Sequence, residues 1–380
     1  MNKNISYQIC ENCVMDTSDY GIVFDTNGIC DYCLNFQKNI KNFFFHGKNK
    51  AKIINNYFDK IKRENKNNKY DCLIGISGGK DSSYLAHILK KNFGLRPLAV
   101  HVDTGWNSKI SVGNVEKMID QLNIDLHTEI INWREMKDLQ LSFFKANHPN
   151  LDIPQDHAIF ASLYKYALKN NINYILTGGN FSTECVREPL EWAYHASDLK
   201  HIKEIHKIFG KEKLETFPFC DIFTYKIFYK YFKNINVFQP LNYINYHKDE
   251  ATELLEKEYS WNSYSHKHYE SRFTMFYEGY WLKKKFNFDK RRAHFSSLIL
   301  TNQMTRKIAL QKLKMNPLND SEIRSEFKFV CEKLDISVEY LNSLMNGENK
   351  TFKDYKSNYY IIQCFVKLLR LVGWEKRIIR

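Results

Sequence analysis

LIGISGGKDSSYLAHIL, residues Leu73 to Leu89, runs from a short apolar stretch into two glycines and then into a helical pattern. The apolar run that begins at Tyr70 and ends at Ile76 predicts a strand covered on both faces. From Ser82 to Lys91 the apolar residues recur at helical spacing. The stretch therefore predicts a buried strand, a tight loop and a helix.

The loop has the composition of an anion site. Gly78 and Gly79 allow backbone conformations that a side chain would forbid, so that several N–H groups can point at one spot near the helix N-terminus. The candidate ligands for a phosphate chain are Ser77, Lys80, Ser82 and Ser83. Asp81 suits such a site only if it helps to hold Mg²⁺. An ordinary strand–turn–helix corner is the simpler alternative, and the G-x-x-x-x-G-K-[ST] pattern of a Walker A loop is absent.

SGGKDSS resembles the PP-loop of the ATP pyrophosphatase superfamily. The resemblance implies ATP and Mg²⁺ as cofactors, cleavage of ATP between its α and β phosphates, and transfer of AMP to a carbonyl oxygen of the substrate. It also implies catalytic roles for Ser77, Lys80, Asp81 and Ser82, with Gly78, Gly79 and Ser83 completing the phosphate site.

The bulk composition sets wide limits. The 380 residues allow two or three domains, and the net charge of +13 suits either nucleic acid or anionic small molecules. No run of 18 apolar residues predicts a membrane span, and the first residues lack the apolar core of a signal peptide. We therefore expect a cytoplasmic protein in which the nine cysteines are ligands or packing residues and not disulfides.

Four of these cysteines form two knuckles, Cys10-x-x-Cys13 and Cys30-x-x-Cys33. This spacing predicts a zinc ribbon over residues 1–45, and four thiolates leave no open position on the metal, so its role would be structural. Four unrelated reduced cysteines or an iron–sulfur cluster are the alternatives.

Residues 46–245 alternate between helical and strand patterns, which predicts an α/β domain with a parallel, Rossmann-like sheet of five strands. After the strand at Tyr70, further strands are expected at Leu95–Val102, Asp125–Ile131, Tyr174–Thr177 and Val237–Leu241, and helices at Ile53–Ile61, Val112–Leu122 and Asp156–Lys169. Three strand ends carry SGGKDSS, DTGW and TGGNFSTE. Ligands of parallel sheets bind at these ends.

The superfamily resemblance extends to the other two strand ends. It implies that His101, Val102 and Asp103 frame the adenine and ribose, although His101 alone could equally be a core histidine. The TGGN segment, Thr177, Gly178, Gly179 and Asn180, would face the α-phosphate. Gly179 replaces the usual histidine there, and Glu184 is the carboxylate expected to hold Mg²⁺ with Asp81.

Residues 246–380 are expected to form a helical, substrate-binding region. Its aromatic residues at helical spacing are most simply core. Two stretches contain too many polar residues close together to be buried as core. These residues are the expected substrate ligands: His266, Lys267, His268, Glu270 and Ser271, followed by Lys290, Arg291, Arg292 and His294. A solvated charged face is the alternative for the second group, and no chemistry is assigned to residues 318–380.

The ordered set of motifs resembles the N-acetyl sugar amidotransferases of bacterial surface-glycan biosynthesis. It comprises C-x-x-C-V-M-D-T-S-D, F-D-x-x-G-I-C-x-Y-C, SGGKDSS, HVDTGWNS, TGGNxxTE, K-H-x-E-S-x-F-T and D-K-R-R-x-H-x-S-x-L-I. The resemblance implies conversion of an acetamido group into an acetamidino group, on a sugar like pseudaminic acid or on a UDP-linked aminuronic acid. AMP would be placed on the amide oxygen and then displaced by ammonia, and the basic C-terminal cluster would clamp an anionic group of the sugar.

No glutaminase motif is present, so the family resemblance implies separate ammonia-supplying partners that resemble the glutaminase and cyclase subunits of histidine biosynthesis. A tRNA-thiolating PP-loop enzyme is the competing interpretation, because it would share the fold, the zinc ribbon and the basic charge. Such enzymes usually need further cysteines to carry sulfur or a cluster, and no C-x-x-C follows the PP-loop. We therefore expect neither a nucleic acid nor a membrane as the partner.

Overall fold

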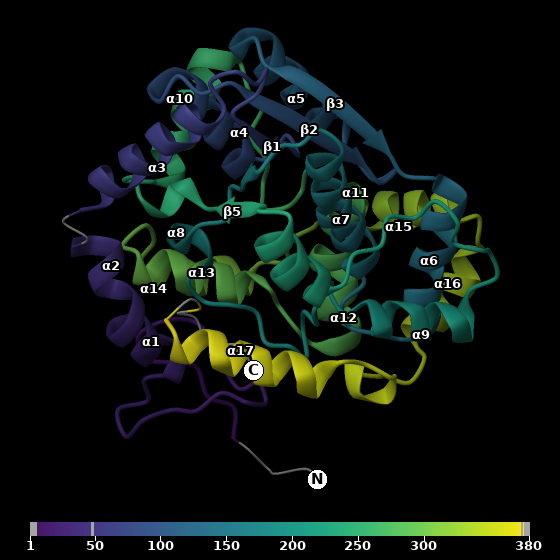
Figure 1. Cartoon of the computed structure of the whole chain (residues 1–380). Helices are drawn as coiled ribbons and strands as arrows, with labels where there is room; N and C mark the ends of the chain where they lie inside the picture. The colour runs from purple at the N-terminus through teal and green to yellow at the C-terminus, as the bar shows by residue number, and fades with distance from the viewer. Residues whose placement is uncertain (1–5, 47–48, 374, 376–380) are drawn as a thin grey trace.

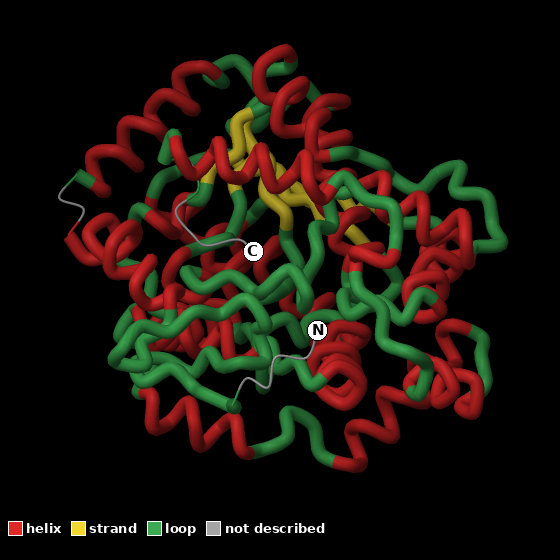
Figure 2. Tube along the Cα trace, turned by 90° about the horizontal axis from the view of Figure 1, so that it is seen from below, coloured by secondary structure: helices red, strands yellow, loops and turns green. Residues whose placement is uncertain are grey.

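The computed structural model describes residues 6–46, 49–373 and 375. At its centre lies a parallel five-stranded sheet with the order β3-β2-β1-β4-β5 (Figure 1; Figure 2 shows the same strands from below). The strands are β1 (Cys72–Gly75), β2 (Pro97–Asp103), β3 (Asp125–Ile130), β4 (Tyr174–Leu176) and β5 (Asn236–Phe238). The predicted sheet is confirmed.

The alternation of side chains along β1 and β2 places a separate core on each face of the sheet. Leu73 and Val100 belong to one buried cluster, while their neighbours Ile74 and Ala99 belong to another. Four helices pack over the second cluster: α3 (Lys50–Glu64), α4 (Lys80–His87), α5 (Lys109–Leu122) and α10 (Lys248–Tyr259). On the other face α7 (Ile153–Lys169) contacts β1, β2 and β4. Burial on both faces explains the unbroken apolar run before the glycines.

The chain order reverses between β1 and β4, because β2 and β3 extend the sheet on one side of β1 and β4 and β5 extend it on the other. Such a switch point leaves a crevice beyond the carboxyl ends of the strands. The turn after β1 lies there. Gly78 has a φ of 75°, and its carbonyl oxygen accepts hydrogen bonds from Trp261 Nε1 (3.2 Å) and Tyr264 Oη (3.1 Å). The turn is therefore fastened by residues almost two hundred positions away.

The C-terminal region is helical, as predicted. Arg272–Phe286 is one continuous helical stretch, α11 (Arg272–Phe276), the π-turn η5 (Tyr277–Trp281) and α12 (Leu282–Phe286). It is followed by α13 (Arg291–Leu300), α14 (Arg306–Lys314), α15 (Asp320–Leu334), α16 (Val338–Met345), η6 (Phe352–Asp354) and α17 (Tyr359–Leu371). Trp281 and Val330 belong to the same buried cluster as Leu73 of the sheet, so this region packs directly on the α/β unit.

The remaining helices were not all expected from the sequence. They are α1 (Asp31–Asn35), η1 (Phe36–Ile40), α2 (Lys41–His46), η2 (Ile88–Asn92), α6 (Trp133–Lys145), α8 (Phe181–Glu184), α9 (Leu199–Phe209), η3 (Thr224–Phe232) and η4 (Pro240–Asn242). Within the described residues, no helix combines the length and apolarity that crossing a bilayer requires.

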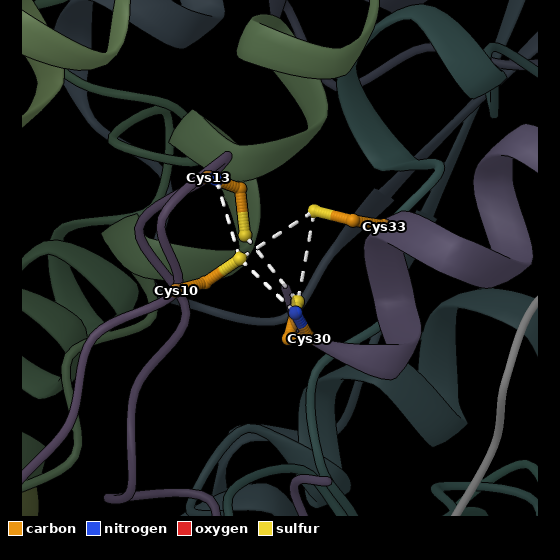
Figure 3. A group of neighbouring side chains, drawn as sticks. All are labelled: Cys10, Cys13, Cys30 and Cys33. Atoms are coloured by element: carbon orange, nitrogen blue, oxygen red, sulfur yellow. Dashed lines mark hydrogen bonds between the residues drawn. The ribbon is translucent and has the colours of Figure 1, made fainter. Parts of the chain in front are cut away.

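The N-terminal segment brings the two cysteine knuckles together (Figure 3). The Sγ atoms lie 3.8 Å apart for Cys10 and Cys33, 3.6 Å for Cys13 and Cys30, and 3.6 Å for Cys30 and Cys33. A tetrahedral zinc with bonds of about 2.3 Å would place its sulfurs about 3.8 Å apart. Backbone N–H groups of Asn12, Cys13 and Cys30 also donate to Cys10 Sγ, which favours a thiolate. The four residues fit a structural zinc ion.

The knuckles are attached to the C-terminal helices. Arg306 donates from Nε and Nη2 to the carbonyl oxygens of Cys10 and Cys13, at 2.8–3.1 Å. On α13, Arg292 donates to Val14 O (2.8 Å), and Ser296 Oγ accepts from Val14 N (3.2 Å). The segment that carries the cysteine cluster is therefore attached to α13 and α14, which come almost three hundred residues later in the sequence.

Gly78→Ala should lower the free energy of unfolding by roughly 2–5 kcal/mol, because of its left-handed backbone and a clash with neighbouring backbone. A Cβ at Gly78 would lie 2.3 Å from Ser111 O. The matched control is Gly113→Ala in α5, where a Cβ would meet nothing within 4 Å; it should leave stability unchanged or slightly raised. Urea unfolding of the three proteins measures this, and equal stability of the two variants would contradict the role given to Gly78.

Purified protein should contain one zinc ion per chain, and Cys13→Ser should remove it and lower the melting temperature by more than about 5 °C. Cys364→Ser is the matched control, because Cys364 is exposed and lies outside the cluster. Elemental analysis and thermal unfolding are the measurements. Metal-free protein that melts like the zinc-loaded form would argue against the site.

Candidate functional site

Three adjoining cavities lie at the carboxyl ends of the strands. The loop cavity, about 480 Å³, is lined by Ser77, by residues 79–82, by Gly178 and Gly179, and by most of residues 261–270. The strand-end cavity, about 440 Å³, is lined by the ends of β1 and β2 and by α7. The helix cavity, about 240 Å³, lies between residues 183–193, residues 266–269 and α13. His268 is the one described residue that lines all three.

The loop cavity is built around the predicted phosphate loop. Ser77, Gly79, Lys80, Asp81 and Ser82 all line it. Ser82 Oγ accepts from Ser77 N and lies 3.3 Å from Ser77 Oγ, so the two hydroxyls are held side by side. Burial lowers the pKa of Lys80, and Asp81 opposes that effect. The ammonium of Lys80 has no carboxylate within 4 Å among the described residues, which leaves its charge available to a ligand.

Two predicted metal ligands converge on one point. Asp81 accepts a hydrogen bond from Tyr246 Oη and lies 3.8 Å from Lys267 Nζ. Glu184 Oε1 lies 2.6 Å from the same Nζ. Burial by itself would lower the pKa of Lys267, but Glu184 and Asp81 outweigh it and the pKa is raised. The two carboxylates therefore face a common cation position, with Lys267 as their present partner.

Glu270 brings a third carboxylate to the loop. Its Oε1 accepts from Ser77 Oγ (3.3 Å), and a Cβ on Gly79 would lie 2.6 Å from it. Burial raises the pKa of Glu270. Its backbone is pinned, because Ser108 N donates to Glu270 O (2.9 Å) and Ser271 pairs with Asn107. The structure thus brings the K-H-x-E-S motif and the D-T-G-W-N-S motif together at the loop.

Of the residues at the end of β2 that were predicted to bind adenosine, only some line a cavity. His101 and Val102 line the strand-end cavity. Asn107 Nδ2 donates to His101 Nε2 (3.0 Å), so Nδ1 carries the proton and donates to Ile76 O (2.8 Å). Asp103 does not line the cavity; it accepts from Gly105 N (2.8 Å) and Asn107 Nδ2 (3.0 Å). Its carboxylate fixes the turn of its own loop.

The loop after β4 is divided in the same way. Thr177 and Gly178 line the strand-end cavity, and Gly179 lines the loop cavity. Asn180 is buried and caps α8, since its Oδ1 accepts from Thr183 N (2.9 Å). Ser83 is also buried away from the cavities, and its hydroxyl has no hydrogen-bond partner among the described residues. In this structure neither side chain can contact a phosphate in the cavities, so the phosphate-binding roles predicted for Asn180 and Ser83 would require these side chains to move.

Most of the predicted substrate ligands lie at the cavities. His266, Lys267, His268, Lys290, Arg291 and His294 line the helix cavity, and Ser271 lines the strand-end cavity. The basic residues already have partners: Lys290 Nζ lies 3.0 Å from Glu188 and 2.8 Å from Glu278, and Arg291 lies 2.6 Å from Asp289. Arg292 lies outside the cavities, in an ion pair with Asp16 (2.9 Å). An anion clamp from this cluster remains a prediction.

His268 has an unusual backbone for its residue type. Its φ is 65°, a left-handed conformation that non-glycine residues adopt mainly where the surroundings enforce it. Its side chain is 48% exposed, and partial removal from water together with the charges of Lys267 and Lys290 lowers its pKa. The ring is therefore neutral, and its closest carboxylate is Glu270, at 4.0 Å.

Several residues at or beside the cavities carried no recognisable signal in the sequence. Tyr246 was not assigned a role, although it contacts Asp81. Asp152, Asp156, Glu188 and Glu278 line the strand-end cavity. In D-I-P-Q-D-H the two aspartates stand at the start of a predicted helix, where acidic residues are ordinary capping and dipole partners. Because acidic residues are common at helix N-termini, no sequence signal placed Asp152 and Asp156 at a cavity.

Two family comparisons match different parts of the chain. Residues 53–218 match the family described as NAD synthase. Residues 270–369 match the family described as LPS biosynthesis protein WbpG-like, C-terminal domain. The first range holds β1 to β4 and the loop after β1, and the second begins at Glu270, beside that loop.

A curated relative is the protein MJ1599 of Methanocaldococcus jannaschii, 29% identical over 185 residues. The match spans 48% of this chain and 63% of that protein, which is less than two thirds of its length.

Two solved structures are distantly similar to this chain. The NH3-dependent NAD synthetase of Campylobacter jejuni is 15% identical, with 79% of this chain and 98% of that chain covered and a TM-score of 0.33. The U34-tRNA thiolase NcsA of Methanococcus maripaludis, solved with its 4Fe-4S cluster, is 14% identical, with 86% and 89% covered and a TM-score of 0.35. Neither likeness bears on function.

The sheet, the loop after β1 and the two family matches lead to one conclusion. This chain is a member of the PP-loop ATP pyrophosphatase superfamily that carries a WbpG-like C-terminal domain.

Proposed function

We propose that this protein is an ATP-dependent amidotransferase of bacterial surface-glycan biosynthesis, which converts the acetamido group of a sugar into an acetamidino group. One observation carries the proposal: the segment that opens the WbpG-like region lies on the PP-loop. Glu270 contacts Ser77, and Lys267, just before it, joins Asp81 and Glu184. A ligand in the loop cavity would therefore touch both the PP-loop and the segment that opens the WbpG-like region.

The chemistry follows from the difficulty of the substrate. An amide carbonyl is a poor electrophile, and transfer of AMP to its oxygen would turn that oxygen into a leaving group. Ser77, Ser82 and the N–H groups at the start of α4 would hold the phosphates, and the uncompensated charge of Lys80 would oppose the negative charge that develops on pyrophosphate. Ammonia would then form the new C–N bond while AMP departs with the oxygen.

Asp81 and Glu184 suit a magnesium ion. Their oxygens already converge on one ammonium group, and hard carboxylate oxygens are the ligands that Mg²⁺ prefers. When bound, Mg²⁺ would supply positive charge to the phosphates of ATP. Tyr246 would orient Asp81, because its hydroxyl donates to one of the two carboxylate oxygens.

The sugar would enter through the helix cavity, which opens beside Thr183 and Glu184 of the loop cavity. A sugar like pseudaminic acid or a UDP-linked aminuronic acid is the proposed substrate class, and the match to a lipopolysaccharide-biosynthesis domain supports it. Ammonia would come from a separate glutaminase partner, because no glutaminase motif occurs in the sequence.

Thiolation of tRNA is the alternative within this superfamily. It would require a cysteine at the reacting centre to carry sulfur or a cluster. None of the nine cysteines lines any of the three cavities, and all nine are among the described residues. This arrangement favours the amidotransferase.

Asp81→Asn should lower sugar-dependent AMP formation by at least ~100-fold, because it removes a carboxylate charge from the proposed metal position. Asp59→Asn, an exposed aspartate on α3, is the matched control and should retain wild-type turnover. AMP release measured by chromatography, together with thermal unfolding of both variants, tests this. Wild-type turnover by Asp81→Asn would exclude the proposed active site.

The route of one oxygen atom tests the reaction itself. A sugar that carries ¹⁸O in its acetamido carbonyl should yield labelled AMP, unlabelled pyrophosphate and an unlabelled amidine, because the carbonyl oxygen leaves with AMP. Mass spectrometry of the products follows the label, with ammonium chloride as the nitrogen source. Label in inorganic phosphate would mean an ADP-forming mechanism and would refute the proposal, as would thiolated tRNA with an unchanged sugar.

A further inference from the structure

Lys267 occupies the position between Asp81 and Glu184 that the proposed function gives to a metal ion. Its Nζ lies 2.6 Å from Glu184 Oε1 and 3.8 Å from Asp81 Oδ2, and it donates to Thr183 Oγ1 at 3.1 Å. Tyr246 Oη donates to Asp81 Oδ1, and Oδ2 is the oxygen nearer the ammonium. A metal ion bonded to Asp81 Oδ2 and Glu184 Oε1 would have to lie close to the present position of Nζ.

The ammonium group and a metal ion cannot share this position. Mg²⁺ bonds to carboxylate oxygens at about 2.0–2.1 Å, so both cations would be crowded against the same two oxygens. The side chain of Lys267 is 19% exposed, so little water is available to screen two positive charges from each other. A metal ion must therefore displace the ammonium group and cannot join it.

The side chain of Lys267 can move while its backbone stays in place. On one side of it, Tyr264 Oη donates to Gly78 O at 3.1 Å. On the other side, Ser271 pairs with Asn107. Lys267 lines both the loop cavity and the helix cavity between these fixed points. Because its ammonium group sits on a flexible four-carbon chain, it can leave the carboxylates and remain within the cavities.

The charges around the loop cavity determine when such a displacement is favourable. A metal ion in place of Lys267 would be balanced by its two carboxylate ligands. The displaced ammonium group and that of Lys80, which has no carboxylate within 4 Å in the described part of the chain, would then face the single carboxylate of Glu270. The phosphates of ATP carry the negative charge that this arrangement lacks. The metal ion should therefore bind poorly alone and well together with ATP.

We infer that Lys267 holds the metal position in the nucleotide-free enzyme and gives it up only when a phosphate chain arrives to bind the displaced ammonium group. The ligand that releases Lys267 is thus a metal–nucleotide complex and not the metal ion alone. Until that complex binds, the carboxylates of Asp81 and Glu184 keep a cation between them. The inference rests on the proposed function, which assigns Mg²⁺ and ATP to the loop cavity.

Binding of free Mn²⁺, a paramagnetic ion that carboxylates bind as they bind Mg²⁺, tests the exchange without nucleotide. Lys267→Met removes the charge and retains a long side chain, so it should bind Mn²⁺ at least about tenfold more tightly than wild type. Lys267→Arg keeps the charge and should stay within a few-fold of wild type. Electron paramagnetic resonance of unbound Mn²⁺ gives the affinities, and thermal unfolding shows that each variant is folded.

Lys248→Met is the matched control for the loss of a positive charge. Lys248 lines the same cavity, and its Nζ lies 3.3 Å from Asp249. This variant should bind Mn²⁺ much as wild type does. Equal tightening in Lys248→Met or in Lys267→Arg, or no tightening in Lys267→Met, would overturn the inference.

A second substitution locates the bound ion. Adding Glu184→Gln to Lys267→Met removes one of the two carboxylates that the ammonium group now joins, so the gain in Mn²⁺ affinity should disappear. Mn²⁺ should likewise raise the melting temperature of Lys267→Met more than that of the double variant. A gain that persists in the double variant would place the metal ion elsewhere and refute the exchange.

The nucleotide gives a prediction of the opposite sign. α,β-Methylene-ATP cannot be cleaved between its α and β phosphates, and with Mn²⁺ it should bind Lys267→Met about tenfold more weakly than wild type, because the displaced ammonium group is missing. Calorimetric titration measures this. Tighter binding of the complex to Lys267→Met would mean that Lys267 merely blocks the site and would overturn the coupling. No sugar is needed in these measurements, so they and the oxygen-label test can fail independently.

Discussion

The carbonyl oxygen of Gly78 is the point on which the site depends. Gly78 has a left-handed backbone, and its oxygen accepts hydrogen bonds from Asn114 of α5 and from Trp261 and Tyr264. Three donors meet one acceptor there. The turn that forms the PP-loop therefore also joins the second layer of helices to the chain that leads into the WbpG-like region. A side chain at this position would clash with the backbone of Ser111 in α5.

The electrostatics of the site differ from what the overall charge of +13 suggests. The lysines and arginines expected to attract an anion are mostly paired inside the protein. Arg292 forms an ion pair with Asp16 of the N-terminal segment, and Lys290 forms ion pairs with Glu188 and Glu278. Lys80 is different, because it lines the loop cavity without a carboxylate partner within 4 Å among the described residues. The positive charge that matters for phosphate chemistry is thus concentrated at the PP-loop.

The sheet could be predicted because each strand carries its own signal: an unbroken apolar run, then glycine, serine or asparagine. The cysteine knuckles were equally local. The pairing of side chains was not local. The ion pair between Lys290 and Glu188 joins residues about one hundred positions apart in the sequence, and the hydrogen bond from Tyr246 to Asp81 joins residues that are still further apart. Asp103 and Asn180 matched the superfamily pattern by position, yet their side chains cap their own loops, which only the three-dimensional arrangement reveals. Spacing in sequence fixes the backbone at strand ends but not the direction of every side chain.

The short backbone pairing between the D-T-G-W-N-S loop and the K-H-x-E-S segment affects how ligands can come and go. Asn107 pairs with Ser271, Ser108 N binds Glu270 O, and Arg272 N binds Trp106 O at 2.9 Å. Many two-part enzymes admit substrate by a hinge that swings the parts open. Here such a hinge would have to break these bonds and the Gly78 contacts together. Substrates must therefore enter, and products leave, through the openings of the cavities. The side chains at those openings, and not a domain motion, would set the rate of product release.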